Sequence, residues 1–152
     1  MPYADWVEVG RALSTALEGL ADGEFFVMGE GSPDAEPRPR LFGRSPQPTP
    51  ARYVQAIRIA GLFSAECVGA TSWGGTWAMD ENTIERLRSM GWQTPAETQA
   101  EHGHLTPNFD LYVEVQEAQS LPDVMVASLA VLGADPRALE LQCPGGSAQL
   151  VG

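Results

Sequence analysis

The sequence predicts an α+β fold, in which an antiparallel sheet carries about three helices packed mainly on one face. Residues 80–91 have the start and stop signals of a helix, and residues 109–115 alternate strictly between apolar and polar side chains. Such alternation indicates a strand with one buried and one solvated face, which is typical of antiparallel sheets. Two more helical patterns, at 5–22 and 120–133, flank the remaining strands.

Length and composition predict a single domain over residues 1–152. The chain is long enough to bury roughly two thirds of its unfolded surface, and 43% of its residues are apolar. Its net charge is −11, and all nine basic residues are arginines. This excess of negative charge argues against nucleic acid and against anionic membrane surfaces as partners. It allows a basic partner, although solubility alone also explains it.

The cytoplasm is the expected location. No apolar run approaches the length of a membrane span, and residues 1–5 lack the features of a signal peptide. The two cysteines, Cys67 and Cys143, lie far apart in the sequence, and neither has a second ligand pair near it. We therefore expect reduced thiols, with Cys67 buried on a strand.

The first thirty residues predict a helix followed by a strand. Asp5 can cap the helix and Glu8 can complete a capping box, after which apolar residues recur at helical spacing on one face. Residues 24–30 are apolar and bounded by glycines, which fits a strand covered on both faces.

Residues 31–50 predict a long loop. They hold six of the twelve prolines, and consecutive X-Pro units resist both helix and central strand. Arg38, Arg40 and Arg44 reverse the local sign of charge on an acidic chain, which makes them candidates for contacting a partner. The alternative is a solvated loop whose arginines offset nearby carboxylates.

Residues 53–60 and 62–68 predict two strands, arranged as an antiparallel hairpin or as one bent strand. In the second, Phe63, Ala65 and Cys67 should point inward.

A Gly-Gly turn follows these strands, flanked by Trp73 and Trp77. Two interpretations of these tryptophans stay open. They form an exposed anchor for a partner, since aromatic residues dominate interface hot spots, or they fold back as a lid on the core.

The helix at 80–91 is expected to begin at Asp80, its N-cap, and to end at Gly91 in a left-handed conformation, with Trp92 packing back on Leu87. Pro95 should prevent a further helix, so residues 94–107 are predicted to form a polar loop.

The strand at 109–115 should bury one set of alternate side chains and expose the other. The expected buried residues are Phe109, Leu111 and Val113, and the expected exposed ones are Asp110 and Glu114.

The helix at 120–133, capped by Ser120, is apolar nearly all round, which indicates burial on more than one side. The sheet of the same chain covers one face and leaves Val124 or Val131 uncovered, so the pattern predicts a homodimer with these residues at its interface. The alternative is that the first helix and the C-terminal segment cover them within one chain. A short strand at 139–142 and a glycine-rich tail that frays after Cys143 complete the prediction.

No motif predicts catalysis, a metal site or a cofactor. His102 and His104 could supply only two of the ligands that a zinc site needs, and no cysteine or carboxylate motif completes the set. A solvated loop is therefore the preferred interpretation of this segment. There is no lysine for a phosphate-binding loop, and no serine has the surroundings of an activated nucleophile.

The order helix, strands, helix, strand, helix resembles the small α+β fold of type III secretion chaperones and YbjN-like proteins. The resemblance covers mainly residues 53–115, and the residues that carry it are Ala65-Glu66-Cys67-Val68, Leu87, Gly91-Trp92, Pro95 and Asn108-Phe109. Their pattern is similar to that of the actinobacterial chaperone-like domains grouped with these two families. The resemblance implies a non-catalytic, dimeric module that binds a protein or peptide client. No site residues carry over from it.

Two other classes stay open from the residues alone. An immunity-like or antitoxin-like protein would use the acidic surface against a basic partner, and its binding should weaken with salt. An enzyme would need a deep pocket with a perturbed titratable group.

Overall fold

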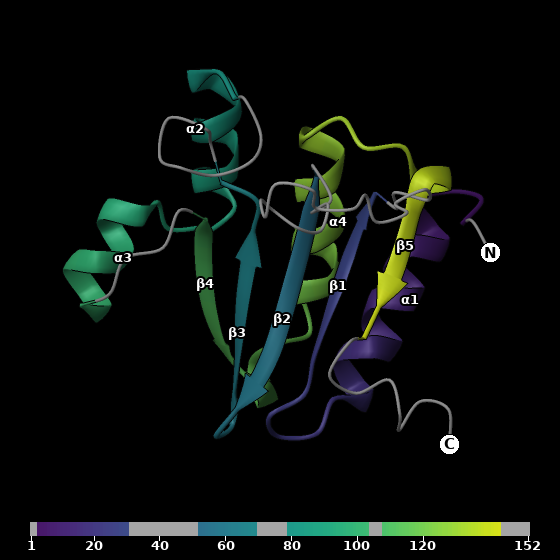
Figure 1. Ribbon diagram of the computed structural model, residues 1–152, viewed down its shortest axis with the longest axis horizontal. Helices are drawn as coiled ribbons and strands as arrows, with labels where there is room; N and C mark the ends of the chain where they lie inside the picture. The colour runs from purple at the N-terminus through teal and green to yellow at the C-terminus, as the bar shows by residue number, and fades with distance from the viewer. Residues whose placement is uncertain (1–2, 31–51, 70–78, 104–107, 144–152) are drawn as a thin grey trace, which may run out of the picture.

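The computed structural model describes residues 3–30, 52–69, 79–103 and 108–143. Figure 1 shows a twisted sheet backed by helices. Its five strands are all antiparallel to their neighbours and follow the order β4-β3-β2-β1-β5. The elements are α1 (Trp6–Gly19), β1 (Phe25–Glu30), β2 (Tyr53–Ile59), β3 (Leu62–Cys67), α2 (Glu81–Ser89), α3 (Pro95–His102), β4 (Phe109–Glu114), α4 (Leu121–Val131) and β5 (Leu139–Gln142), with single 3-10 turns at Val115–Glu117 and Pro136–Ala138.

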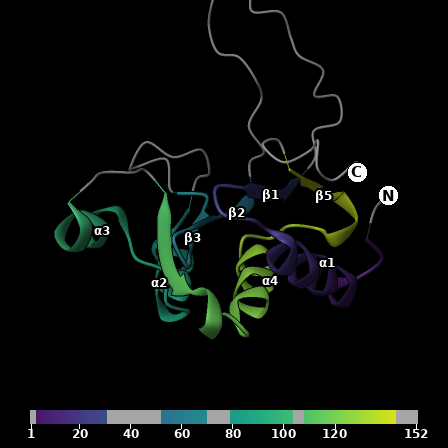
Figure 2. The same cartoon turned by 90° about the horizontal axis from the view of Figure 1, so that it is seen from below.

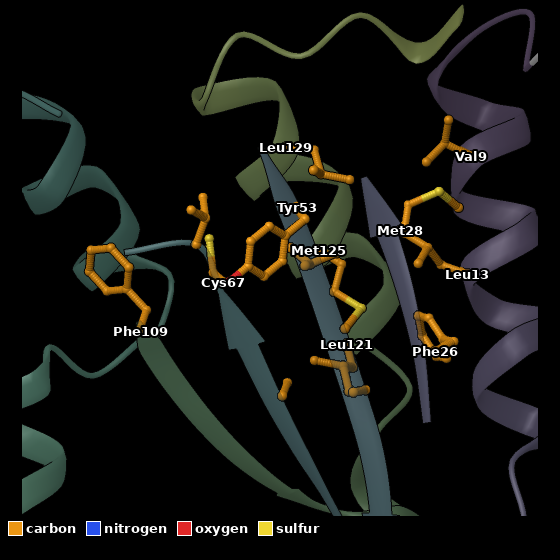
Figure 3. Close-up of a cluster of buried hydrophobic side chains, with 14 of the residues drawn as sticks. Val9, Leu13, Phe26, Met28, Tyr53, Cys67, Phe109, Leu121, Met125 and Leu129 are labelled. Atoms are coloured by element: carbon orange, nitrogen blue, oxygen red, sulfur yellow. The ribbon is translucent and has the colours of Figure 1, made fainter. Parts of the chain in front are cut away.

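The helices lie mainly on one face of the sheet, which confirms the predicted fold class. Figure 2 shows α1, α4 and α2 on the same side of the strands, and α3 beyond the β4 edge. The core fills the space between these helices and the sheet. Val9 and Leu13 of α1 point toward Met28 of β1, and Met125 and Leu129 of α4 lie nearby (Figure 3). All five side chains are fully buried.

The hairpin of β2 and β3 follows the prediction. Ala60 and Gly61 both have positive φ, 50° and 84°, and they form the two-residue turn that twisted hairpins favour. Phe63, Ala65 and Cys67 point into the core with at most 3% of their surface exposed.

The end of α2 also follows the prediction. Asp80 accepts a capping hydrogen bond from the Thr83 N–H at 2.8 Å. Gly91 has a φ of 112°. The N–H groups of Gly91 and Trp92 then donate to the Arg88 and Leu87 carbonyls at 3.0 and 3.4 Å. These two bonds form a Schellman motif, which satisfies carbonyls that the helix itself cannot.

The predicted loop at 94–107 is wrong over its first half, because α3 begins there. Thr94 and Glu97 form a complete capping box, and Pro95 occupies the first turn. Proline lacks only an N–H that has no helical partner at that position, so the residue that blocks the continuation of α2 suits the start of α3. Ser120 is a smaller correction, because it stands at the N-cap of α4 without a side-chain capping bond.

Two strands differ from their predicted burial. Asp110, expected to be exposed, is 2% exposed, because Gln93 pairs with it from the outer side of β4 through two backbone hydrogen bonds of 2.8 and 3.0 Å. Phe109 is buried, whereas Leu111 and Val113 are half-buried.

In β1, which was expected to be covered on both faces, Phe26 and Met28 are buried under α1. Phe25 and Val27 are half-buried because helices cover only one face of the described sheet.

Trp92 connects the end of α2 to α4. Its side chain is 2% exposed, and its indole N–H donates to Ser128 Oγ at 2.8 Å. The Ser128 hydroxyl in turn donates to the Val124 carbonyl at 2.6 Å. Both buried polar groups are thereby satisfied inside an apolar environment.

Ser128→Ala should lower the free energy of unfolding by about 1–3 kcal/mol, because it leaves the buried Trp92 N–H without its acceptor. Urea denaturation followed by circular dichroism measures the change. Ser89→Ala, on the exposed end of α2, is the matched control and should cost less. Equal denaturation midpoints for Ser128→Ala and the wild type would contradict a structural role for this hydrogen bond.

Acid should weaken the contact between α2 and α3. Arg88 Nη2 lies 2.6 Å from Glu97 Oε2, and this hydrogen bond lowers the pKa of Glu97 to about 2, below its ordinary 4.5. A carboxylate with a lowered folded-state pKa stabilises the fold above its unfolded pKa, and that stability is lost as pH falls toward the folded value. Glu97→Gln should therefore flatten the loss of stability between about pH 5 and pH 2. The effect should be small because the pair is exposed, and identical pH profiles of thermal midpoints for both proteins would contradict it.

Candidate functional site

The two edge strands of the sheet, β4 and β5, differ in how far other segments occupy their outer sides. The outer side of β4 is partly occupied, since Gln93 pairs with Asp110 and α3 contacts the strand. β5 forms the opposite edge, and in the described part of the chain no strand pairs with its outer side. An open strand edge presents unpaired backbone donors and acceptors and is a template for another segment.

The hydrogen-bond pattern of β1 determines which β5 groups point outward. The Glu30 N–H donates to the Arg52 carbonyl and the Arg58 N–H donates to the Glu24 carbonyl, so the even-numbered residues of β1 bond to β2. The odd-numbered residues therefore bond to β5, where Gly29 and Val27 face Glu140 and Gln142. Leu141 lies between these two, so its own N–H and C=O point away from the sheet.

A groove of 630 Å³ lies beside this edge, between β5 and α1. Figure 2 shows α1 below β1 and β5 on the helix-covered side of the sheet. The residues that give the groove its shape are Ala12, Ala16 and Gly19 of α1, Phe26 of β1, and Leu141 and Cys143 at the edge.

The small side chains of α1 create the space. α1 buries Val9, Leu13 and Leu17 against the core, and its neighbouring flank carries Ala12, Ala16 and Gly19. A Cβ placed on Gly19 would meet nothing within 4 Å. The groove is consequently apolar and large enough for side chains from another segment.

The charges around the groove are mainly negative. Glu8, Glu24 and Arg11 line it, and Glu140 projects from β5 on the other face of the sheet. Burial raises the pKa of the Cys143 thiol, and the nearby carboxylate of Glu24 raises it further. Burial likewise raises the pKa of Tyr3 at the groove, helped by Cys143 and Glu140. Both groups therefore stay neutral at physiological pH.

The structure does not describe the residues that the sequence predicts as partner contacts. Trp73, Trp77, Arg38, Arg40 and Arg44 fall outside the described residues, as does His104. The groove was missed, although the spacing of Ala12, Ala16 and Gly19 beside the apolar face of α1 was a usable signal.

Val124 and Val131, predicted to line a homodimer interface, are half-buried on α4 and pack against the core. α4 lies between α1 and α2 (Figure 2), and both helices contact it. Helices of the same chain thus flank α4, and the homodimer stays a prediction.

Both cysteines are free thiols, and Cys67 is buried on β3 as predicted. Within the described ranges, no group of three or more histidine, cysteine, aspartate or glutamate side chains is arranged to hold a metal ion. None of the helices described is long and apolar enough to span a membrane.

Comparison with known proteins identifies the family. Residues 2–144 match the model of TY-Chap3, described as T3SS (YopN, CesT) and YbjN peptide-binding chaperone 3. The chain belongs to this family. The match covers nearly the whole chain and confirms the resemblance to type III secretion chaperones and YbjN-like proteins. No curated protein and no solved structure matches the sequence. The TY-Chap3 description supports a protein-binding or peptide-binding role.

Proposed function

We propose that this TY-Chap3 protein binds an extended segment of a client protein, without catalysis, in the groove between α1 and β5. The observation that carries the proposal concerns Leu141, which lies directly beside an apolar groove. Its backbone N–H and C=O point away from the sheet, on a side where no described strand pairs with β5. The family description, which names peptide binding, supports the same function.

The bound segment adds to the sheet as a sixth strand. Its backbone exchanges two hydrogen bonds with the N–H and C=O of Leu141, and alternate side chains enter the groove beside Ala12 and Ala16. Backbone bonds of this kind are independent of sequence and supply affinity, whereas the groove selects side chains. Each medium-sized apolar side chain that the groove buries contributes about 1.5–3 kcal/mol.

Two titratable side chains of the groove fit binding better than catalysis. Its thiol, Cys143, has a raised pKa, and a protonated thiol is a poor nucleophile. Its phenol, Tyr3, has a raised pKa as well, so neither group suits proton transfer at neutral pH. The two free cysteines also support a reducing compartment such as the cytoplasm.

Filling the groove should weaken peptide binding. The probes are heptapeptides selected from a random displayed library by the full-length wild-type chain. Ala16→Trp places a large ring among the groove residues and should weaken these peptides at least tenfold, or about 1.4 kcal/mol. The matched control is Ala130→Trp on an exposed position of α4, which should leave affinity unchanged. Fluorescence anisotropy measures both, with circular dichroism to verify folding. Equal affinities for the two folded variants would place the binding site elsewhere.

A further inference from the structure

The two faces of the sheet give the residues of an added strand two alternating environments. Side chains that lie opposite Leu141 and Cys143 share their face of the sheet and enter the groove above α1. Side chains that lie opposite Glu140 and Gln142 fall on the other face, which no described helix covers. A bound segment is therefore apolar at alternate positions and polar between them.

Glu140 is the charged residue that such a strand meets on the open face. It is exposed, and its partner on β1 is Gly29, which has no side chain to contact it. The carboxylate is thus available to the residue on its outer side. Opposite charges directly across two antiparallel strands stabilise the pair.

The charges around the β5 edge favour a positively charged segment in general. Glu8 and Glu24 add two carboxylates at the groove against the single guanidinium of Arg11. Arg137, three residues before Glu140, pairs with Asp135 at 3.4 Å. The whole chain carries a net charge of −11, which attracts basic segments and repels acidic ones.

We propose that the client segment runs antiparallel to β5 and has, from its N-terminus to its C-terminus, the pattern apolar–polar–apolar–basic. Its lysine or arginine faces Glu140. The two apolar residues face Cys143 and Leu141, and the polar residue between them faces Gln142. The antiparallel direction follows from the sheet, in which every neighbouring pair is antiparallel. This inference rests on the proposed function and adds the chemistry of the client.

The test is the sequence pattern that the groove selects. Wild-type chain, Glu140→Arg and the control Glu117→Arg, all full-length, each select heptapeptides from the same random library. Glu117 is exposed in the 3-10 turn after β4, so its substitution changes the net charge equally at a different place. The wild type and Glu117→Arg should enrich lysine or arginine next to an apolar–polar–apolar pattern. Glu140→Arg should enrich aspartate or glutamate there, and a charge-swapped peptide should bind this variant several-fold more tightly than it binds wild type.

Other outcomes of this selection, or of a sedimentation measurement, would contradict the role of Glu140, the proposed function, or the choice of a client as the occupant of the groove. Groove-dependent peptides with the same charge preference for all three proteins would contradict the role of Glu140 and leave the proposed function intact. No enrichment by the wild type would contradict the proposed function itself. Selected peptides that follow the uncharged Ala148-Gln149-Leu150 pattern would assign the groove to the chain's own C-terminal segment. A dimer that Ala16→Trp dissociates in sedimentation equilibrium would assign it to a second copy.

Discussion

The pairing of β1 with both of its neighbours is the interaction on which the rest of the structure depends. Glu24 and Glu30 bond to β2 through their backbones, which sends the backbones of Val27 and Gly29 to β5. The same alternation turns Phe26 and Met28 toward α1, where they are fully buried. One strand therefore determines the core and the orientation of the outer edge, since a slip of one residue would turn every side chain to the opposite face.

The position of α1 follows from this core and leaves the groove beside it. Val9 and Leu13 point toward the buried face of β1, so the flank of Ala12 and Ala16 comes to lie next to the β5 edge. A larger residue at either alanine would fill the space without any gain to the core. The opposite edge is different, because the backbone of Gln93 already pairs with Asp110. Within the described residues, the proposed client strand therefore has one favourable edge to join, that of β5.

Local signals predicted much of the fold, because each acts within a few residues. The Asp80 cap, the Gly91 stop and the β2–β3 hairpin depend only on neighbouring chemistry. α3 was missed because Pro95 ends one helix and begins another, and sequence spacing does not distinguish these roles. The burial of Asp110 and the placement of β5 beside the small residues of α1 were not predictable in this way, because they depend on which distant segments lie side by side. Gln93 is 17 positions from Asp110, and the groove joins α1 to β5 across most of the chain.

Strand addition at Leu141 is the central claim, and backbone methylation of a selected peptide tests it most directly. An N-methyl group at the residue facing Leu141 removes the N–H that donates to this edge and adds bulk at the contact. The same group one residue away, facing Glu140 or Gln142, sits on an N–H that points to solvent. Titration of a series of singly methylated peptides should show affinity falling at least tenfold at alternate positions, with little change between them. Equal affinities along the series, or losses without alternation, would contradict binding as a sixth strand.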